Sequence, residues 1–208
     1  MDARLFASAT QRNREPILGV LRRVLPSRGE VLEIASGTGE HAAWLAAQLP
    51  GLVFQPSDPS PAHRASIAAW IASAGLANLR APLALDVTSA DWEQGAGIPR
   101  DLAAILCINL IHIAPWAAAL GLLRGAGAAL AAGRPLYLYG PYRRGGEHTA
   151  PSNAAFDRSL RGQDPEWGVR DLEAVMEAAE GAGFALEEIV EMPANNLSVI
   201  LRRRGAAG

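Results

Sequence analysis

The sequence predicts an α/β fold in which helices cover a mostly parallel, Rossmann-like sheet of seven strands that ends in an antiparallel strand. Three observations support this prediction. Short apolar runs alternate with longer segments of helical period along the chain. A glycine-rich turn follows the first run, as in nucleotide-binding folds. The last two runs are separated by only five residues (192–196), too few for a crossover helix, so they must pair antiparallel.

The elements follow from this pattern. Helices are expected near 10–25, over 40–49, 60–74, 115–132 and 169–182, and shortly after Thr88. Ser60 and Pro61 suit the cap and first turn of the helix at 60–74. The strands are expected at 31–35, 52–55, 83–87, 102–108, 136–139, 184–191 and 197–203.

Two segments outside this core are expected to flank a site. The helix near 10–25 either folds over the site as a lid or presents a solvated face. The irregular insert at about 141–168 follows the fifth strand, where a long loop is expected to build the substrate side of a site. All of this fits one domain over residues 1–208.

The composition excludes several classes of protein. A net charge of -2 gives no general attraction for nucleic acid, so no nucleic-acid partner is expected. The apolar stretch at 102–123 is long enough to span a bilayer, but Asn109, His112 and Pro115 interrupt it, and a strand, a turn and a helix explain it better. No signal-peptide pattern and no metal-ligand spacing occur. A cytoplasmic protein without a membrane partner or a metal is expected.

The strongest local signal is the turn Glu33-Ile-Ala-Ser-Gly-Thr-Gly-Glu-His41. Gly37 and Gly39 let the backbone turn sharply and approach a ligand, and the alternative is an ordinary strand-to-helix turn. The pattern of Glu33, a small residue at Ala35 and the two glycines resembles the S-adenosylmethionine-binding turn of methyltransferases. His41 ends the motif and is included among the cofactor residues.

Three later positions complete the expected cofactor site. Asp58 follows the second strand, where a carboxylate accepts hydrogen bonds from ribose hydroxyls, unless it serves only as a turn residue. Asp86 with Val87 is expected at the adenine, or Asp86 caps the next helix. Asn109 follows the fourth strand, whose carboxyl end is expected to face the reactive part of a bound cofactor, unless the amide makes only a structural hydrogen bond.

Seven segments together resemble a known family, a domain of unknown function classed among the S-adenosylmethionine-dependent methyltransferases, found in bacteria and as a methyltransferase-like protein in animals. They are Arg12–Pro16, Leu32–His41, Gln55–Asp58, Asn109–Trp116, Ser152–Asp157, Trp167–Asp171 and Met192–Asn196. The resemblance covers nearly the whole chain. It implies the class I methyltransferase fold, with S-adenosyl-L-methionine as cofactor and S-adenosyl-L-homocysteine as product, but no substrate. The Asp-Pro-Pro-Tyr or Asn-Pro-Pro-Tyr motif of nucleic-acid amino methylases is absent, because Leu110 and Ile111 follow Asn109.

We therefore expect a methyltransferase that acts on a small molecule. His112 is the first candidate for a general base and Tyr142 the second, and a structural role is the alternative for each. Arg170 would suit a carboxylate on the substrate. The substrate-side candidates are Arg12, Asn13, Asn153, Asp157, Trp167, Arg170, Asn195 and Asn196. A second hypothesis is a non-catalytic S-adenosylmethionine-binding sensor or partner subunit. A nicotinamide (NAD) dehydrogenase is disfavoured by Glu33 and by the terminal hairpin.

Overall fold

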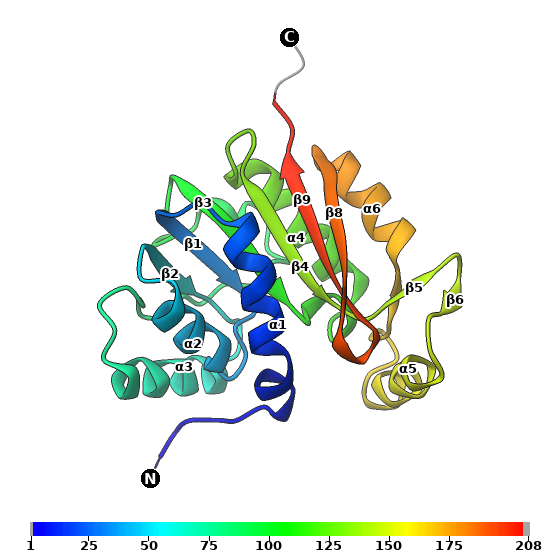
Figure 1. Cartoon of the computed structure of the whole chain (residues 1–208), viewed down its shortest axis with the longest axis horizontal. Helices are drawn as coiled ribbons and strands as arrows, with labels where there is room; N and C mark the ends of the chain where they lie inside the picture. The colour runs from blue at the N-terminus through cyan, green and yellow to red at the C-terminus, as the bar shows by residue number, and fades with distance from the viewer. Residues whose placement is uncertain (1, 206–208) are drawn as a thin grey trace.

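A computed structural model describes residues 2–205, and its main sheet has six strands in the order β2-β1-β3-β4-β9-β8 (Figure 1). The first four strands run parallel, and β9 runs antiparallel to both β4 and β8. The predicted α/β fold with its antiparallel ending is confirmed. The strands are β1 (Gly29–Ile34), β2 (Leu52–Pro56), β3 (Leu102–Ile108), β4 (Pro135–Gly140), β8 (Phe184–Met192) and β9 (Asn196–Arg203).

The expected strand at 83–87 is wrong, so the main sheet has six strands rather than seven. This segment reaches the end of β2 only through an isolated bridge between Ser57 and Leu83. Pro82 has no N–H to offer a ladder, and the side chain of Asp86 accepts hydrogen bonds from the N–H and the hydroxyl of Thr88, which turns the chain away.

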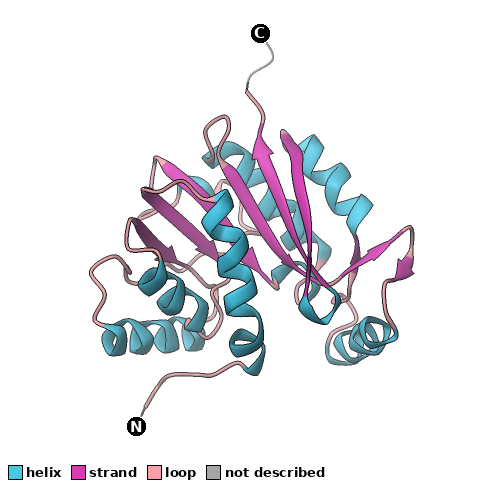
Figure 2. Cartoon of the chain, viewed as in Figure 1, coloured by secondary structure: helices cyan, strands magenta, loops and turns pink. Residues whose placement is uncertain are grey.

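Helices cover both faces of the sheet (Figure 2). On one face, α1 (Ser8–Val24), α2 (Glu40–Gln48) and α3 (Pro61–Ala74) pack on strand residues such as Leu106. On the other, α4 (Trp116–Ala129) and α6 (Leu172–Gly181) pack on residues such as Ile105. Because side chains alternate along a strand, each buried strand supplies both layers of core.

The N-terminal helix belongs to this core. Ile17, Leu21 and Val24 of α1 are buried against the sheet, and only the first turns of the helix extend beyond the carboxyl ends of the strands (Figure 1). The expected lid is therefore limited to those first turns, since most of the helix is held by its apolar face. No helix of the described residues is long and apolar enough to cross a membrane.

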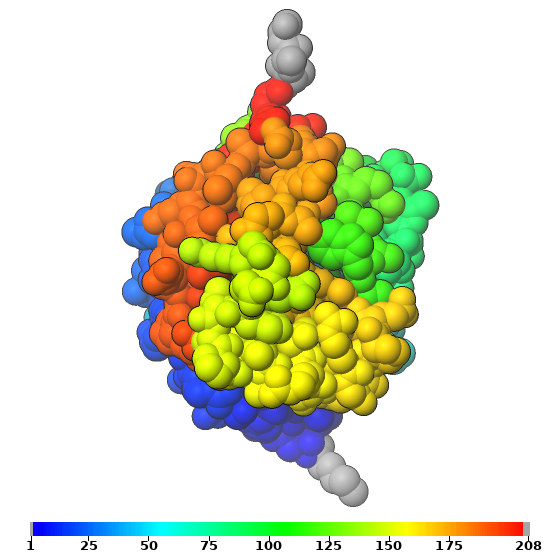
Figure 3. Space-filling model, turned by 90° about the vertical axis from the view of Figure 1, so that its right-hand side faces the viewer, coloured from blue at the N-terminus to red at the C-terminus, as the bar shows by residue number. Residues whose placement is uncertain are grey.

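The insert after β4 is more regular than the sequence indicates. It contains β5 (Tyr142–Arg144), β6 (Glu147–His148) and α5 (Pro151–Gln163), and β5 also pairs with β7 (Arg170–Asp171) in a small separate sheet. The helix expected from 169 consequently begins at Leu172. Figure 3 shows the insert as a yellow block on the surface, directly above the blue N-terminal segment.

The strand order fixes the position of the site. β2 lies on one side of β1 and β3 on the other, so the loops that follow β1 and β3 leave the sheet in opposite directions. The crevice between such loops, at the carboxyl ends of the strands, is where open α/β sheets bind ligands.

Candidate active site

The loop after β1 has the backbone of a ligand-binding turn. Ala35, Gly37 and Gly39 have φ values of 54°, 56° and 88°. A Cβ on Gly39 would lie 2.8 Å from the Cα of Ile67 on α3, whereas one on Gly37 would meet nothing within 4 Å. Gly39 therefore serves close packing, while the backbone at Gly37 faces open space. The left-handed conformation of Ala35, a residue with a Cβ, is the kind of local strain found at functional sites.

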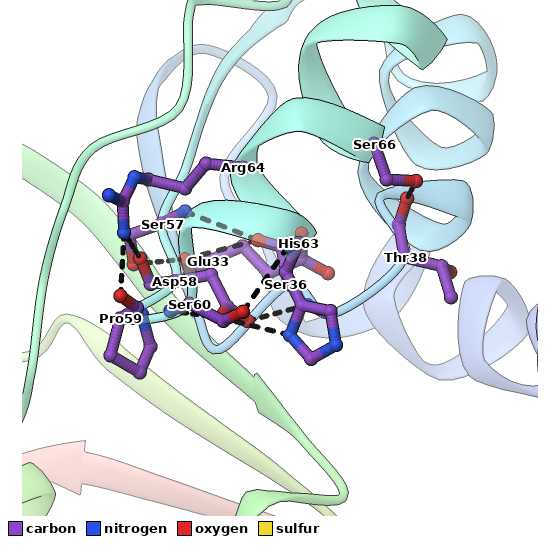
Figure 4. A network of polar contacts seen from close by, with 11 residues as sticks. Glu33, Ser36, Thr38, Ser57, Asp58, Pro59, Ser60, His63, Arg64 and Ser66 are labelled. Atoms are coloured by element: carbon purple, nitrogen blue, oxygen red, sulfur yellow. Dashed lines mark hydrogen bonds and ion pairs between the residues drawn. The ribbon is translucent and has the colours of Figure 1, made fainter. Parts of the chain in front are cut away.

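Asp58 ties this loop to the loop after β2 (Figure 4). Its Oδ2 accepts a hydrogen bond from the N–H of Gly37 at 2.9 Å. Its Oδ1 accepts one from the N–H of Ser60 at 2.9 Å and lies 3.0 Å from Nδ1 of His63. The carboxylate is only 3% exposed and is held between the two loops.

The N-terminal segment is attached to the same loop. The hydroxyl of Ser66 on α3 donates to the carbonyl of Thr38 at 2.7 Å and accepts from the N–H of Leu5 at 2.8 Å (Figure 4). The N–H of Ala7 donates to the carboxylate of Glu40 at 2.7 Å. The start of the chain thus lies against the glycine loop and the beginning of α2.

Glu33 is the least satisfied polar group of the site. It is 1% exposed, and its Oε2 has no hydrogen-bond partner among the described residues. Burial raises the pKa of this carboxyl to about 7, so near neutral pH the protonated and the ionised forms of Glu33 are both populated. A buried oxygen without a donor beside a ligand-binding turn fits a ligand that brings the missing donor.

A first cavity, of about 370 Å³, opens beside the glycine loop. Its wall is mostly apolar, which suits a flat heterocyclic ring. Asp86 is the one acid in the lining: its Oδ1 accepts from Thr88, and its Oδ2 makes no hydrogen bond with another described residue. The lining includes Ala35, Asp86, Val87, Leu110, Ile113 and Trp167.

A second cavity, of about 420 Å³, adjoins the first at Ile113, which lines both. It lies between the first turns of α1, the turn after β3, the end of β4, α5 and the turn between β8 and β9. Six residues expected at the site meet here, although they come from distant parts of the chain. They are Arg12, Asn13, Asn109, His112, Asn153 and Asn196.

His112 lies on the wall of the second cavity and is 4% exposed. Its ring packs edge-on against Phe156, with the ring centres 5.6 Å apart, and makes no hydrogen bond with another described residue. Burial, together with the charge of Arg170, lowers the pKa of His112 to about 3. The imidazole is therefore neutral at pH 7, with one ring nitrogen that can accept a hydrogen bond from a hydroxyl. A pKa this low makes the free imidazole a weak base, so it would take up a proton only as the hydroxyl loses it during a reaction.

Tyr142 does not reach either cavity. It is 1% exposed and packs in the core between the sheet and helices α4 and α6, and its hydroxyl has no hydrogen-bond partner among residues 2–205. Burial raises the pKa of Tyr142 above its usual range. This burial contradicts the expectation that Tyr142 serves as a base, because the side chain points into the sheet core rather than to the edge.

Arg170 and Asp157 hold the insert in place. The Nη2 of Arg170 donates to the carbonyl of Ala114 at 2.9 Å and its guanidinium stacks near the ring of Trp116. Asp157 accepts from the N–H of Val169 at 2.7 Å. Main-chain carbonyls accept from Nε and Nη2 of Arg170, which favours a structural role, while binding of a substrate carboxylate by Arg170 stays a prediction.

Three further candidates lie elsewhere than expected. Trp167 lines the first cavity, on the cofactor side. His41 is buried behind the loop, where its Nε2 lies 2.8 Å from Oδ1 of Asn13, and burial lowers its pKa to about 4. Asn195 is in the left-handed conformation at φ 57°, and its Nδ2 donates to the hydroxyl of Ser152 at 3.3 Å. His41 and Asn195 therefore support the cavity walls.

Sequence reasoning missed Tyr139, which lines the second cavity together with Phe156 of the Ser152–Asp157 motif. Tyr139 is the fourth residue of the strand expected at 136–139, so its place at the carboxyl edge was available as a signal. Phe156 lies on α5, and nothing in the sequence indicated which face of that helix meets the site. No group of three or more His, Cys, Asp or Glu residues that could hold a metal occurs between residues 2 and 205.

The fold matches solved methyltransferase structures. An O-methyltransferase family protein from Burkholderia thailandensis superposes with a TM-score of 0.78 at 16% identity, over 93% of this chain and 57% of that one. The S-adenosylmethionine-dependent methyltransferase SibL gives 0.76 at 21%, over 95% and 56%. The mitomycin 7-O-methyltransferase MmcR gives 0.78 at 16%, over 94% and 54%. The chain thus spans little more than half the length of these proteins.

These likenesses show that the α/β fold is that of the class I methyltransferases. A relationship to an animal methyltransferase-like protein stays a prediction. A family described as "Protein of unknown function (DUF938)" matches residues 4–203. The match covers nearly the whole chain, and the protein therefore belongs to the DUF938 family.

Proposed function

We propose that the protein is an S-adenosylmethionine-dependent methyltransferase that methylates a hydroxyl group of a small molecule. One observation carries the proposal: two cavities adjoin at the switch point of the sheet, and a neutral imidazole lies on the wall of the second. The O-methyltransferase titles of the similar structures support it.

The cofactor would be held around the first cavity. The open backbone at Gly37 and the unpartnered oxygen of Glu33 fit the polar methionine end, the carboxylate of Asp58 fits the ribose, and the free Oδ2 of Asp86 fits the adenine amino group. When bound, S-adenosylmethionine supplies a methyl group whose bond to the sulfonium breaks, with the electron pair left on sulfur, as the acceptor oxygen forms the new carbon–oxygen bond.

The residues of the second cavity would handle the acceptor. Asn109 lines the second cavity just after β3, where its backbone has the left-handed conformation at φ 70°. His112 accepts the proton that the hydroxyl loses and releases it to solvent after transfer. Phe156 and the closely packed Gly140 fix the plane of the imidazole. In this proposal most of the rate enhancement comes from positioning the acceptor hydroxyl against the methyl group.

The experiment that tests the proposal begins with calorimetric titration of the protein with S-adenosylmethionine, S-adenosylhomocysteine and NADH. Binding of the first two, but not of NADH, is expected. A screen of small hydroxylated molecules with labelled S-adenosylmethionine then tests turnover, with the His112→Asn variant beside the wild type. We expect the variant to bind S-adenosylhomocysteine normally and to lose about 10²-fold or more in rate.

The other outcomes identify the alternatives. Tight binding of S-adenosylmethionine without turnover on any acceptor would indicate a cofactor-binding sensor or partner subunit. Binding of NADH alone would indicate a dehydrogenase. If His112→Asn turned over as fast as the wild type, the imidazole would not be the base.

A further inference from the structure

The charge of the residues that line the second cavity indicates which kind of acceptor would bind there. Among the residues that line it, none is an aspartate or a glutamate, and one, Arg12, is a cation. Since His112 is neutral, the lining has a net positive charge. Ligand cavities take their selectivity from a few polar groups of this kind placed in a largely fixed wall.

Arg12 has no hydrogen-bond or ion-pair partner in the described part of the chain, residues 2–205. Arginines such as Arg80 and Arg202, by contrast, pair with a glutamate. Several exposed arginines are also unpaired, but Arg12 is the one that lines this cavity. An unpaired guanidinium at a cavity is suited to a carboxylate, which it binds through two parallel N–H···O bonds.

The charge of Arg12 acts on the inside of the cavity. Burial raises the pKa of the Tyr139 phenol, while hydrogen bonds with Asn13 and Asn196 and the positive charge of Arg12 oppose that rise. The guanidinium therefore lies near enough to the Tyr139 hydroxyl to influence it. An anion held by Arg12 would lie beside the hydroxyl of Tyr139 and the amides of Asn13 and Asn196.

The remaining wall favours a flat ring. Phe156 keeps 40% of its surface exposed although it lies in the cavity lining, and Ile113, also 40% exposed, forms another apolar part. Exposed large apolar side chains at a concave site indicate an apolar ligand surface. The edge of the Phe156 ring is fixed by His112, so a ring placed against these side chains would bring its substituents close to the imidazole.

We propose that the methyl acceptor is a small hydroxylated aromatic compound with a carboxylate or a similar anionic group, and that Arg12 selects it by binding the anion. That this compound is a methyl acceptor rests on the proposed function, but the binding preference for an anion does not require turnover. Arg12 acts as a specificity-determining residue. It comes from α1, whereas the base comes from the turn after β3.

The test uses three molecules of the same shape and different charge: 3,4-dihydroxybenzoate, catechol and 3,4-dihydroxybenzylamine. Their binding to the full-length protein saturated with S-adenosylhomocysteine is measured by calorimetry or ligand-observed NMR, and their methylation is measured separately. We expect the benzoate to bind more tightly than catechol, and the amine most weakly.

Two variants assign the preference to Arg12. In Arg12→Gln the benzoate should lose roughly tenfold in affinity while catechol is unaffected, because one charge-assisted contact is removed. In Arg12→Glu the order of benzoate and amine should reverse. Arg158→Gln is the matched control: Arg158 lies exposed on α5, is not part of either cavity, and its loss changes the net charge equally.

Each result separates the two proposals. Anion-selective binding that depends on Arg12, without methylation, would support Arg12 as the anion-binding residue of this cavity and count against the enzyme proposal. If all three molecules were methylated at equal rates and bound with equal affinities, the result would support the enzyme proposal and overturn the proposed class of acceptor. Absence of binding by all three, or an equal loss for benzoate and catechol in Arg12→Gln, would also overturn the acceptor class.

Discussion

Asp58 and Gly37 are joined by a hydrogen bond of 2.9 Å from the main-chain N–H of Gly37 to Oδ2 of Asp58. The bond connects the loops that follow two neighbouring parallel strands, β1 and β2. It gives the acid two roles, since the same carboxylate that fits a ribose also sets the position of the glycine loop.

Replacing Asp58 with alanine should therefore weaken both the fold and cofactor binding. The variant leaves the N–H groups of Gly37 and Ser60 without their acceptor, which costs about 1–3 kcal/mol in the free energy of unfolding. Affinity for S-adenosylhomocysteine should fall by tenfold or more. Urea denaturation and calorimetry measure the two effects. Asp101→Ala is the control, because that side chain is 89% exposed and lies 4.0 Å from its arginine partner. Equal affinities for Asp58→Ala and wild type would contradict the assignment.

The buried carboxyl of Glu33 predicts a pH dependence of stability. An unfolded Glu33 loses its proton near pH 4.5, whereas the folded one keeps it up to about pH 7. Between these values the native state binds more protons, so this group makes the free energy of unfolding fall as the pH rises, and its contribution is constant above that window.

Glu33→Gln should remove this dependence. Relative to the wild type, the variant should gain on the order of 3 kcal/mol in the free energy of unfolding between about pH 4 and pH 8. Urea denaturation of both proteins across this range measures the difference. Parallel pH profiles for the two proteins would show that Glu33 titrates normally in the folded state.

A side chain at Gly140 should reduce turnover, because Gly140 packs closely against the ring of His112. A Cβ on Gly140 would lie 2.8 Å from Nδ1 of His112, so Gly140→Ala must displace the buried ring. Turnover should fall by about tenfold or more, as expected when a general base moves from its position, while affinity for S-adenosylhomocysteine stays at the wild-type level. Gly162→Ala in α5 is the control, because a Cβ there meets nothing within 4 Å. Undiminished turnover in Gly140→Ala would argue against His112 as the base.

Arg170 should act on stability and not on substrate choice. Arg170→Gln removes hydrogen bonds to the carbonyls of Ile111 and Ala114, which should lower the free energy of unfolding by about 1–3 kcal/mol. The preference between 3,4-dihydroxybenzoate and catechol should not change. Arg158→Gln controls for the lost charge. If the preference disappeared in Arg170→Gln but persisted in Arg12→Gln, the roles assigned to the two arginines would be exchanged.

Local chemistry explains which parts of the site the sequence predicts well. The glycine turn follows a strand directly, so Ala35, Gly37 and Gly39 must lie at the carboxyl edge wherever that strand sits in the sheet. The same holds for Asn109 after β3. The strand at 83–87 failed because apolar residues followed by an acid suit a strand, but Leu85 and Val87 pack in the core from a turn instead.

The roles of individual arginine and tyrosine residues could not be predicted from the neighbouring sequence. Arg170 and Arg12 both lie in polar motifs, and the residues around them do not reveal which guanidinium forms hydrogen bonds within the protein. The carbonyls that occupy Arg170 belong to the turn after β3, far away in sequence. Tyr139 and Tyr142 differ by three residues, yet one lines the cavity and the other is buried in the core.

The sequence by itself determined the α/β fold, its antiparallel ending and the glycine loop at the carboxyl edge of the sheet, because these follow from hydrophobic periodicity and from residues adjacent in the chain. Only the tertiary structure decided that α1, α5 and the turn between β8 and β9 meet around His112. It also decided that Arg12 lines this cavity without a partner among the described residues, while Arg170 donates to main-chain carbonyls. Such contacts join segments that are far apart in the sequence, and they depend on how the core packs rather than on any local pattern.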